Sequence, residues 1–348
     1  MSMDLKKVII DLCDLPGPSG FEEKVTAYVK TLLEPYTDEV RIDVMGNVIG
    51  VRRCGTENAP KLLFDAHIDE IGLIVTGVEE GFLRFAGLGG LDARVIPASG
   101  VMIQTNPPIY GVISVLPPHI MKKEDTEKNF KIEDLFIDIG MTHDEAVRLV
   151  TPGTHGTVAH GAMPFGDNLI CGKAIDDRIG LAAILRALDL LKDIKLEVDL
   201  YIMASVQEEV GLRGAIVGAY SVSPDYCVVV EVHHAKTPDT KNADVNASLG
   251  DGVIIVRGPN MNPMLTEKIF DLAKENDIKH QVSVISTGMS GTNARSIQIS
   301  REGVATALLG IPLKYMHCAN ELSSLDDTEC AAQLLAETAK SLKGVNRV

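Results

Sequence analysis

The chain has 348 residues, 45% hydrophobic and 23% charged, an ordinary composition for a globular protein large enough for two domains. Its formal net charge of −15 argues against nucleic acid as a partner, because an acidic surface repels phosphate. No stretch approaches the ~20 apolar residues of a membrane helix, and charged residues interrupt the N-terminal segment. The sequence therefore predicts a cytoplasmic protein with neither a signal peptide nor a membrane partner.

The first 68 residues are predicted to form two helices, a hairpin and a short strand. The second helix is expected to begin at a capping box, Ser19-x-x-Glu22. Alternating polar and apolar residues on either side of a Gly-Asn turn predict a hairpin over residues 40–51. Residues 62–64 form a short apolar run that is typical of a buried strand.

Residues 69–163 differ in character from the rest of the chain. Glycine is frequent there, short β-like runs recur, and helical periodicity is nearly absent, as in a small β-barrel or sandwich. We therefore predict an inserted β-barrel-like domain over 69–163 and a main domain formed by 1–68 and 164–348. Within the insert, the charged residues 122–131 are expected to form a mobile, solvated loop.

Helical and strand patterns alternate in the remainder of the chain. They predict helices over 177–191, 211–220, 263–276 and 326–342, and strands over 196–204, 226–232, 281–285 and 308–313. This alternation indicates an α/β fold with a mostly parallel sheet covered by helices on both faces.

Histidines and carboxylates gather where the predicted strands end, which is where ligands bind in open α/β sheets. A single histidine at such a place is more often a hydrogen-bonded core residue. Several acids in one cleft, however, would repel one another unless cations were present, and oxygen and nitrogen ligands without thiolate suit Zn, Co or Mn. The candidates are His67, Asp69, Asp176, Glu208, Glu209, Glu231 and His317.

Two divalent ions would suit this set. Each ion needs about three protein ligands and an open position, so five side chains are enough if one carboxylate bridges both ions. Such a pair holds a water or hydroxide between the ions and polarises a substrate carbonyl. The adjacent Glu208 and Glu209 point in different directions, so one can bind metal while the other accepts the proton of the water.

Six short motifs follow one another along almost the whole chain. They are Leu15-Pro-Gly-Pro-Ser-Gly-Phe-Glu22, Asp65-Ala-His-Ile-Asp-Glu-Ile-Gly72, Gly172-Lys-Ala-Ile-Asp-Asp-Arg178, Gln207-Glu-Glu-Val-Gly-Leu-Arg-Gly-Ala215, Arg301-Glu-Gly-Val304 and the segment around His317. In order and spacing they resemble the tetrahedral aminopeptidases, dizinc exopeptidases that include the bacterial and archaeal glutamyl aminopeptidases. The resemblance implies a metal-dependent hydrolase that removes the N-terminal residue of peptides.

The resemblance also implies how the two ions are held. His67 and Glu231 would hold one ion. Glu209 and His317 would hold the other, and Asp176 would bridge them. The sequence departs from the family at Glu231, where Asp is usual, and the neighbouring His233-His234 offers a less favoured alternative ligand. A longer carboxylate can still bind, but it shifts the ion or changes the number of oxygens offered.

Two further roles follow from the resemblance. Glu208 would be the general base and then the acid, and Asp69 would hydrogen-bond His67 and fix its tautomer. Dizinc relatives often have a cis peptide bond after the bridging residue, here Asp176. The family fold is an α/β catalytic domain interrupted by a β-barrel-like dimerisation domain. Its members are usually homo-oligomeric dodecamers whose active sites face an internal chamber.

The sequence departs from the family again at Gly291-Thr-Asn-Ala-Arg295, where Gly-Thr-Asp-Ala and then a small residue are common. Asn293 removes a charge and Arg295 adds one, so both are predicted to lie near the substrate pocket. Cys318 also stands where Ser is common.

Other functions compete with this interpretation. One is a metal-poor, inactive or regulatory subunit of the same family. Another is a dizinc hydrolase with a different substrate, such as a carboxypeptidase or a deacetylase. A third is a glucanase, since some relatives are described as endoglucanases. The absence of Trp and the 4% aromatic content offer few stacking surfaces for sugars, which disfavours the last.

Overall fold

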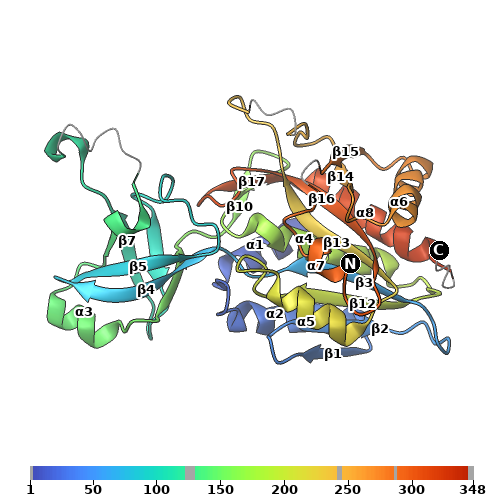
Figure 1. Cartoon of the computed structure of the whole chain (residues 1–348), viewed down its shortest axis with the longest axis horizontal. Helices are drawn as coiled ribbons and strands as arrows, with labels where there is room; N and C mark the ends of the chain where they lie inside the picture. Colours follow the sequence, from blue (N-terminus) through green and yellow to red (C-terminus); the bar gives the residue numbers. More distant parts are fainter. Residues whose placement is uncertain (1–2, 122–129, 241–244, 286–287, 344–348) are drawn as a thin grey trace.

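The computed structural model describes residues 3–121, 130–240, 245–285 and 288–343. It consists of an α/β body and a closed β-barrel that lies to one side of it (Figure 1). The helices are α1 Leu5–Asp14, α2 Glu23–Leu33, α3 His143–Leu149, α4 Ile175–Leu191, α5 Arg213–Val222, α6 Pro263–Glu275, α7 Ala294–Ile297 and α8 Leu325–Ser341. Within these ranges, no helix combines the length and apolar character needed to cross a bilayer.

The α/β body is built on one eleven-stranded sheet, in the order β1-β2-β12-β3-β13-β16-β17-β11-β10, with β14 beside β16 and β15 beside β14. These strands are β1 Glu39–Ile42, β2 Val48–Arg52, β3 Lys61–His67, β10 Met163–Phe165, β11 Leu169–Gly172, β12 Asp199–Ser205, β13 Tyr226–His234, β14 Val253–Arg257, β15 His280–Val284, β16 Ala305–Lys314 and β17 Glu321–Ser324.

The centre of the sheet is parallel, as the alternation of helices and strands predicts. Strands β12, β3, β13 and β16 run in the same direction. The flanking pairs β1–β2, β2–β12, β16–β17, β17–β11 and β11–β10 are antiparallel, and so is β14–β16, whereas β14–β15 is parallel. The sheet as a whole is therefore mixed. Three of these pairs, β1–β2, β10–β11 and β16–β17, join consecutive strands by short connections and need no crossover helix. The sequence patterns did not reveal β10, β11, β14 and β17, which are only three to five residues long.

Helices cover both faces of the sheet, which confirms that prediction. Leu62, Phe64 and Ala66 of β3 belong to the larger core, which they share with α1, α4 and α8. Leu63 belongs to the core on the opposite face, beneath α5 and α7. Because side chains alternate along a strand, His67 at the end of β3 lies on the same side as Leu63.

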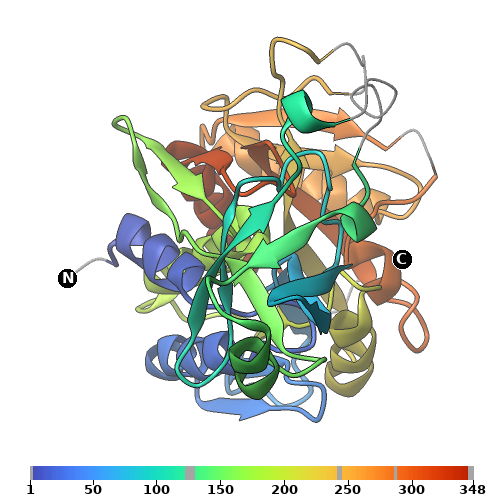
Figure 2. The same ribbon diagram turned by 90° about the vertical axis from the view of Figure 1, so that its left-hand side faces the viewer.

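The predicted β-rich insert contains a closed barrel in the order β4-β5-β8-β7-β6-β9, and Figure 2 views the molecule from that side. Its strands are β4 Gly72–Glu79, β5 Phe82–Leu88, β6 Gly100–Ile103, β7 Ile109–Ser114, β8 Phe136–Asp138 and β9 His155–Val158. The barrel has a hydrophobic core of its own, which includes Val75, Leu83 and Ile113. The charged loop predicted at 122–131 falls mostly on residues 122–129, which lie outside the described part of the chain.

The capping box predicted at Ser19-x-x-Glu22 is wrong. Helix α2 begins at Glu23, and the Glu22 side chain makes no capping hydrogen bond. The Ser19 hydroxyl instead donates to Asp69 Oδ2 at 2.6 Å, and Glu22 Oε1 accepts from Gln207 N at 3.1 Å. Partners from other parts of the chain therefore replace the local hydrogen bonds that the motif would make.

A buried ion cluster joins the N-terminal segment, the start of the insert and α4. The Lys173 ammonium lies 2.9 Å from Glu70 Oε1, and Arg178 Nη2 lies 3.3 Å from the same oxygen. All three side chains are at most 6% exposed. Arg178 also donates to the carbonyls of Leu12 and Ile68, so the cluster attaches β3 and its following loop to the end of α1.

We expect Glu70→Gln to lower the free energy of unfolding by about 3–5 kcal/mol, because it leaves two buried cations without a counter-charge. Denaturant unfolding measures the loss. The control is Glu79→Gln, which breaks a more exposed 2.7 Å pair with Arg84, and we expect it to cost under about 1 kcal/mol. Equal costs for the two variants would show that the buried cluster does not stabilise the fold.

Candidate active site

The register of the central strands brings His67 and Glu231 together. Strands β3 and β13 are parallel, with Asp65 opposite Val229. His67 and Glu231 each lie two residues further along and so face the same side of the sheet. His67 Nε2 is 3.4 Å from Glu231 Oε1, and both side chains are nearly buried. Glu231, which stands where Asp is usual, thus lies beside His67, where a metal ligand is predicted.

Asp176 lies between the two predicted metal sites. Its Oδ1 is 3.0 Å from His67 Nε2, and its Oδ2 is 3.4 Å from His317 Nε2. His317 Nε2 is also 3.2 Å from Glu209 Oε1. The peptide bond between Asp176 and Asp177 is cis, as predicted. The structure therefore brings all five predicted ligands together, with one oxygen of Asp176 directed to each histidine.

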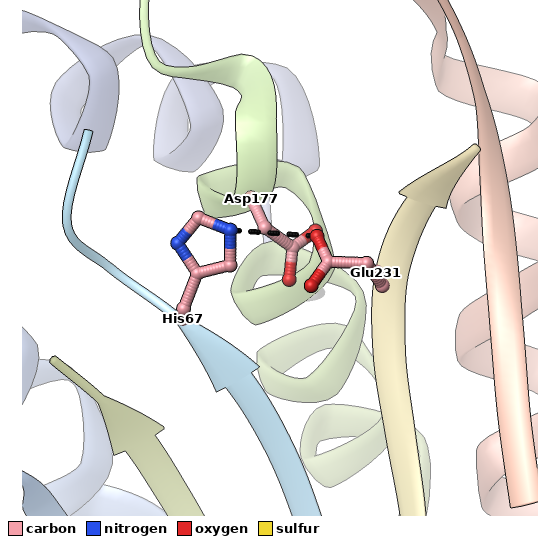
Figure 3. A group of neighbouring side chains, drawn as sticks. All are labelled: His67, Asp177 and Glu231. Carbon is pink, nitrogen blue, oxygen red and sulfur yellow. Dashed lines mark ion pairs between the residues drawn. The ribbon is translucent and has the colours of Figure 1, made fainter. Parts of the chain in front are cut away.

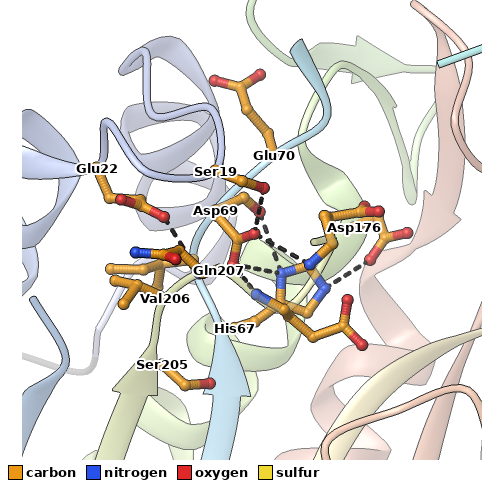
Figure 4. Close-up of polar contacts among 12 residues, drawn as sticks. Ser19, Glu22, His67, Asp69, Glu70, Asp176, Ser205, Val206 and Gln207 are labelled. Atoms are coloured by element: carbon orange, nitrogen blue, oxygen red, sulfur yellow. Dashed lines mark hydrogen bonds and ion pairs between the residues drawn. The ribbon is translucent and has the colours of Figure 1, made fainter. Parts of the chain in front are cut away.

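Asp69 organises the loop that carries the two adjacent glutamates (Figure 4). Its carboxylate accepts hydrogen bonds from Glu208 N at 3.0 Å, from Glu209 N at 3.2 Å and from the Ser19 hydroxyl. His67 Nδ1 lies 3.1 Å from the main-chain oxygen of Asp69 and 3.5 Å from its Oδ1. The main-chain oxygen is therefore the closer acceptor for an Nδ1–H, which leaves Nε2 facing Asp176.

The side chains around His67 have the donor atoms that a metal ion requires. Two groups have ligand atoms within 4.8 Å of one another: His67 with Asp177 and Glu231 (Figure 3), and His67 with Asp176 and Glu209. Among the described atoms, Glu231 Oε2 and both carboxylate oxygens of Asp177 are buried without a hydrogen-bond partner. Buried oxygens of this kind are costly unless a cation or a proton compensates them.

The pKa shifts of the buried carboxylates also indicate that the cluster lacks compensating positive charge. Burial, with repulsion from Asp176, raises the pKa of Glu231 to about 7. Burial, with repulsion from the neighbouring carboxylates, raises the pKa of Glu208 to about 9. Divalent cations would relieve both effects, so the residues present fit the metal ions that the resemblance implies.

A cavity of about 650 Å³ opens onto the cluster. Six predicted residues line it: His67, Asp176, Glu208, Glu209, Glu231 and His317. Other parts of its wall come from the end of β13, with His233 and His234, from β14 and β15, and from the segment 289–295, with Arg295. His233 belongs to neither of the described metal-binding groups. A larger cavity of about 1050 Å³ lies at the opposite ends of β13 and β16 and contains none of the predicted site residues.

Asn293 does not line this cavity, contrary to the prediction. It is completely buried, and its Nδ2 donates to Asp65 Oδ2 and to Ser205 Oγ, both at 2.9 Å. Asp65 is itself completely buried in β3 and requires a donor there. The Asn293 amide therefore hydrogen-bonds to side chains of the central strands and is not available to a substrate. Of the two residues, only Arg295 lines the cavity.

The barrel also contributes to the site, through two glycines that follow β5. A Cβ at Gly90 would lie 2.7 Å from His317 Cε1, and a Cβ at Gly89 would lie 3.1 Å from Glu209 Cβ. Neither glycine could be predicted from the sequence, because nothing local distinguishes them from others in a glycine-rich segment.

The comparison with known families agrees with this geometry. The family model of the M42 glutamyl aminopeptidases matches residues 46–334. The chain belongs to this family. The lysyl aminopeptidase of Pyrococcus furiosus is 36% identical over 346 residues, covering 97% of this chain and 96% of that protein. Family membership makes the chain a peptide hydrolase of the aminopeptidase type.

Solved structures agree as well. A TET aminopeptidase from the marine sediment archaeon Thaumarchaeota archaeon SCGC AB-539-E09 superposes with a TM-score of 0.92 at 34% identity, covering 97% of this chain and 96% of that one. The Pyrococcus horikoshii TET1 peptidase, described as assembling into a tetrahedron or a large octahedral shell, gives 0.85 at 30% identity, with coverage of 97% and 100%. The resemblance inferred from the sequence motifs is confirmed.

We expect Gly90→Ala to lower kcat/KM on aminoacyl substrates by on the order of 10²-fold, because a small displacement of a catalytic group is enough for such a loss. The new methyl group would push the His317 imidazole away from Asp176. Gly77→Ala is the matched control, since the space beside this barrel glycine is open. Equal activity in the two variants would contradict a role for Gly90 in seating His317.

Proposed function

We propose that this protein is a dinuclear metallo-aminopeptidase that hydrolyses the N-terminal peptide bond of peptides. The observation that carries the proposal is the position of Asp176, whose two oxygens face His67 and His317 separately. A carboxylate placed in this way would be shared between two divalent cations. His67 and Glu231 would hold one ion, and Glu209 and His317 the other.

Zinc or cobalt suits these nitrogen and oxygen ligands, and manganese is also compatible. Bound ions would act as Lewis acids that polarise the scissile carbonyl and make water more acidic. The remaining steps belong to the protein. Glu208 lines the cavity, and its main-chain N is held by Asp69, so its carboxylate is directed by a fixed backbone.

The Glu208 carboxylate accepts a proton from the attacking water and returns it to the nitrogen of the leaving amine. The water oxygen bonds to the carbonyl carbon as the C–N bond breaks, which releases the first amino acid and a shortened peptide. The acidic lining also favours the α-ammonium group of the substrate, which would restrict cleavage to the end of a chain.

Arg295 supports a preference for acidic N-terminal residues. Among the described lining residues, the only carboxylates are those of the metal cluster. Burial lowers the pKa of both His233 and His234, which favours their neutral forms. Arg295 is the only Arg or Lys among the described lining residues. We propose that the first side chain of the substrate lies along this wall, where Glu pairs with Arg295 and Lys is repelled.

We also propose that residues 69–163 form a dimerisation domain inserted between 1–68 and 164–348. The similarity to tetrahedral TET assemblies supports a homo-oligomer built from such dimers, with a dodecamer as the expected form. Sedimentation and mass photometry of the full chain test this assembly.

We expect Glu208→Gln to reduce kcat by about 10²–10⁴-fold, because the amide cannot accept the proton of the water. The variant should still bind two ions, which elemental analysis of the purified protein measures. Glu197→Gln, at an exposed position, serves as the control.

Full activity in Glu208→Gln would contradict its assignment as the base. Two bound ions without hydrolysis of any aminoacyl substrate, in the presence of Zn, Co or Mn, would instead favour an inactive subunit or a dizinc hydrolase with another substrate.

The proposal for Arg295 predicts that the wild-type protein cleaves N-terminal Glu faster than its neutral isostere Gln, and Lys more slowly. Arg295→Glu should lower the ratio of kcat/KM for Glu over Lys substrates by about tenfold, since it reverses the charge on the cavity wall. Arg148→Glu, on the exposed face of α3, is the control. An unchanged ratio in Arg295→Glu would refute the assignment.

A further inference from the structure

Glu321 is a buried acid that neither the sequence motifs nor the proposed ligand set includes. It lies at the first residue of β17 and is 2% exposed. Its Oε2 accepts a hydrogen bond from the main-chain N of Asp176 and its Oε1 accepts one from the main-chain N of His317, each at 3.0 Å. One carboxylate thus joins the backbones of two residues whose side chains face each other across the site.

Both of these backbones adopt conformations that regular secondary structure does not stabilise. Asp176 has non-helical dihedral angles at the start of α4, and Ala174 before it has a φ of 57°. His317 has a φ of 62° in the turn between β16 and β17. Positive φ values are unfavourable for residues other than glycine, so the turn needs hydrogen bonds from elsewhere.

The sheet carries Glu321 to the place where both backbones can be reached. Strand β17 pairs with β11 in a register that puts Glu321 opposite Gly172, four residues before Asp176. The turn from β16 returns His317 to the same place, four residues before Glu321 in the chain. Glu321 is therefore a single side chain that links the main chains of Asp176 and His317 at the place where the strands bring them together.

The two sides of Asp176 depend on Glu321 to different degrees. On one side, His67 is 1% exposed and belongs to the central parallel strands. On the other side, the His317 side chain is 33% exposed and lies in the turn. Loss of the hydrogen bonds that Glu321 accepts would displace His317 far more easily than His67.

We propose that Glu321 is a positioning residue that sets the affinity of the ion held by Glu209 and His317. The inference rests on the proposed dinuclear site. Partners that orient metal ligands through hydrogen bonds typically change metal affinity by about 10–100-fold when they are removed. Glu321→Gln keeps one acceptor oxygen, but its NH₂ group cannot accept the second main-chain N–H.

A second buried acid supplies a matched control. Asp327 is 1% exposed and also accepts two main-chain N–H groups, those of Gly250 and Gly252, each at 2.7 Å. It does not line the cavity of the proposed metal site. Neither glycine is a predicted ligand, so Asp327→Asn removes the same kind of interaction without touching the main chain of a ligand.

The experiment is a titration of metal-stripped full-length protein with Co²⁺, followed by calorimetry and by the absorption spectrum of the bound ion. The wild-type protein is expected to bind two ions. Glu321→Gln should bind one ion with wild-type affinity and the second about 10–100-fold more weakly. Asp327→Asn should bind both ions as the wild type does, even if its melting temperature falls by as much as that of Glu321→Gln.

Two wild-type affinities in Glu321→Gln would overturn the inference, and so would an equal loss in Asp327→Asn, which would indicate a general effect of lower stability. A wild-type protein that binds fewer than two ions would refute the dinuclear proposal instead. In that case the inference is decided by the remaining ion: weaker binding in Glu321→Gln than in Asp327→Asn supports it, and equal binding overturns it.

Discussion

The buried carboxylate of Asp176 faces two histidines, His67 and His317, and the candidate site in the α/β body depends on this position of Asp176. Each histidine also faces a second carboxylate, Glu231 for His67 and Glu209 for His317, so Asp176 is the acid that the two pairs share. The parallel strand β3 supplies His67 from one direction, and the turn after β16 supplies His317 from another. A shift of β3 by one residue would turn His67 to the opposite face of the sheet, so the register of the central strands is part of the site.

The residues of the candidate site and the central fold could be predicted because their signals are local. Apolar runs mark β3, β13 and β16, and the polar residues that interrupt or follow them, such as His67 and Glu231, stand out against them. In open α/β sheets, ligands bind beyond the carboxyl ends of the strands, so residues that are separate in the sequence could be assigned to one candidate site. The glycine-rich texture of the insert likewise predicted a barrel, which closes as expected.

The residues that orient the ligands could not be predicted in this way. Ser19 resembles a helix cap in sequence, yet its hydroxyl donates to Asp69, fifty residues away. Asn293 was placed at the pocket by its motif, but the helix that follows it turns its side chain towards the buried Asp65. Glu321 lies in a strand of four residues with no distinctive pattern. Each of these side chains has a plausible local role, and only the tertiary structure decides which partner it takes.

The glycines after β5 connect the barrel to the chemistry. Gly90 leaves room for the imidazole of His317 and Gly89 for Glu209, so the connection between β5 and β6 lies against one half of the proposed metal centre. That half is also the more exposed one, since His317 is 33% exposed whereas His67 is 1% exposed. Any movement of the barrel relative to the sheet would therefore act first on the Glu209 and His317 side.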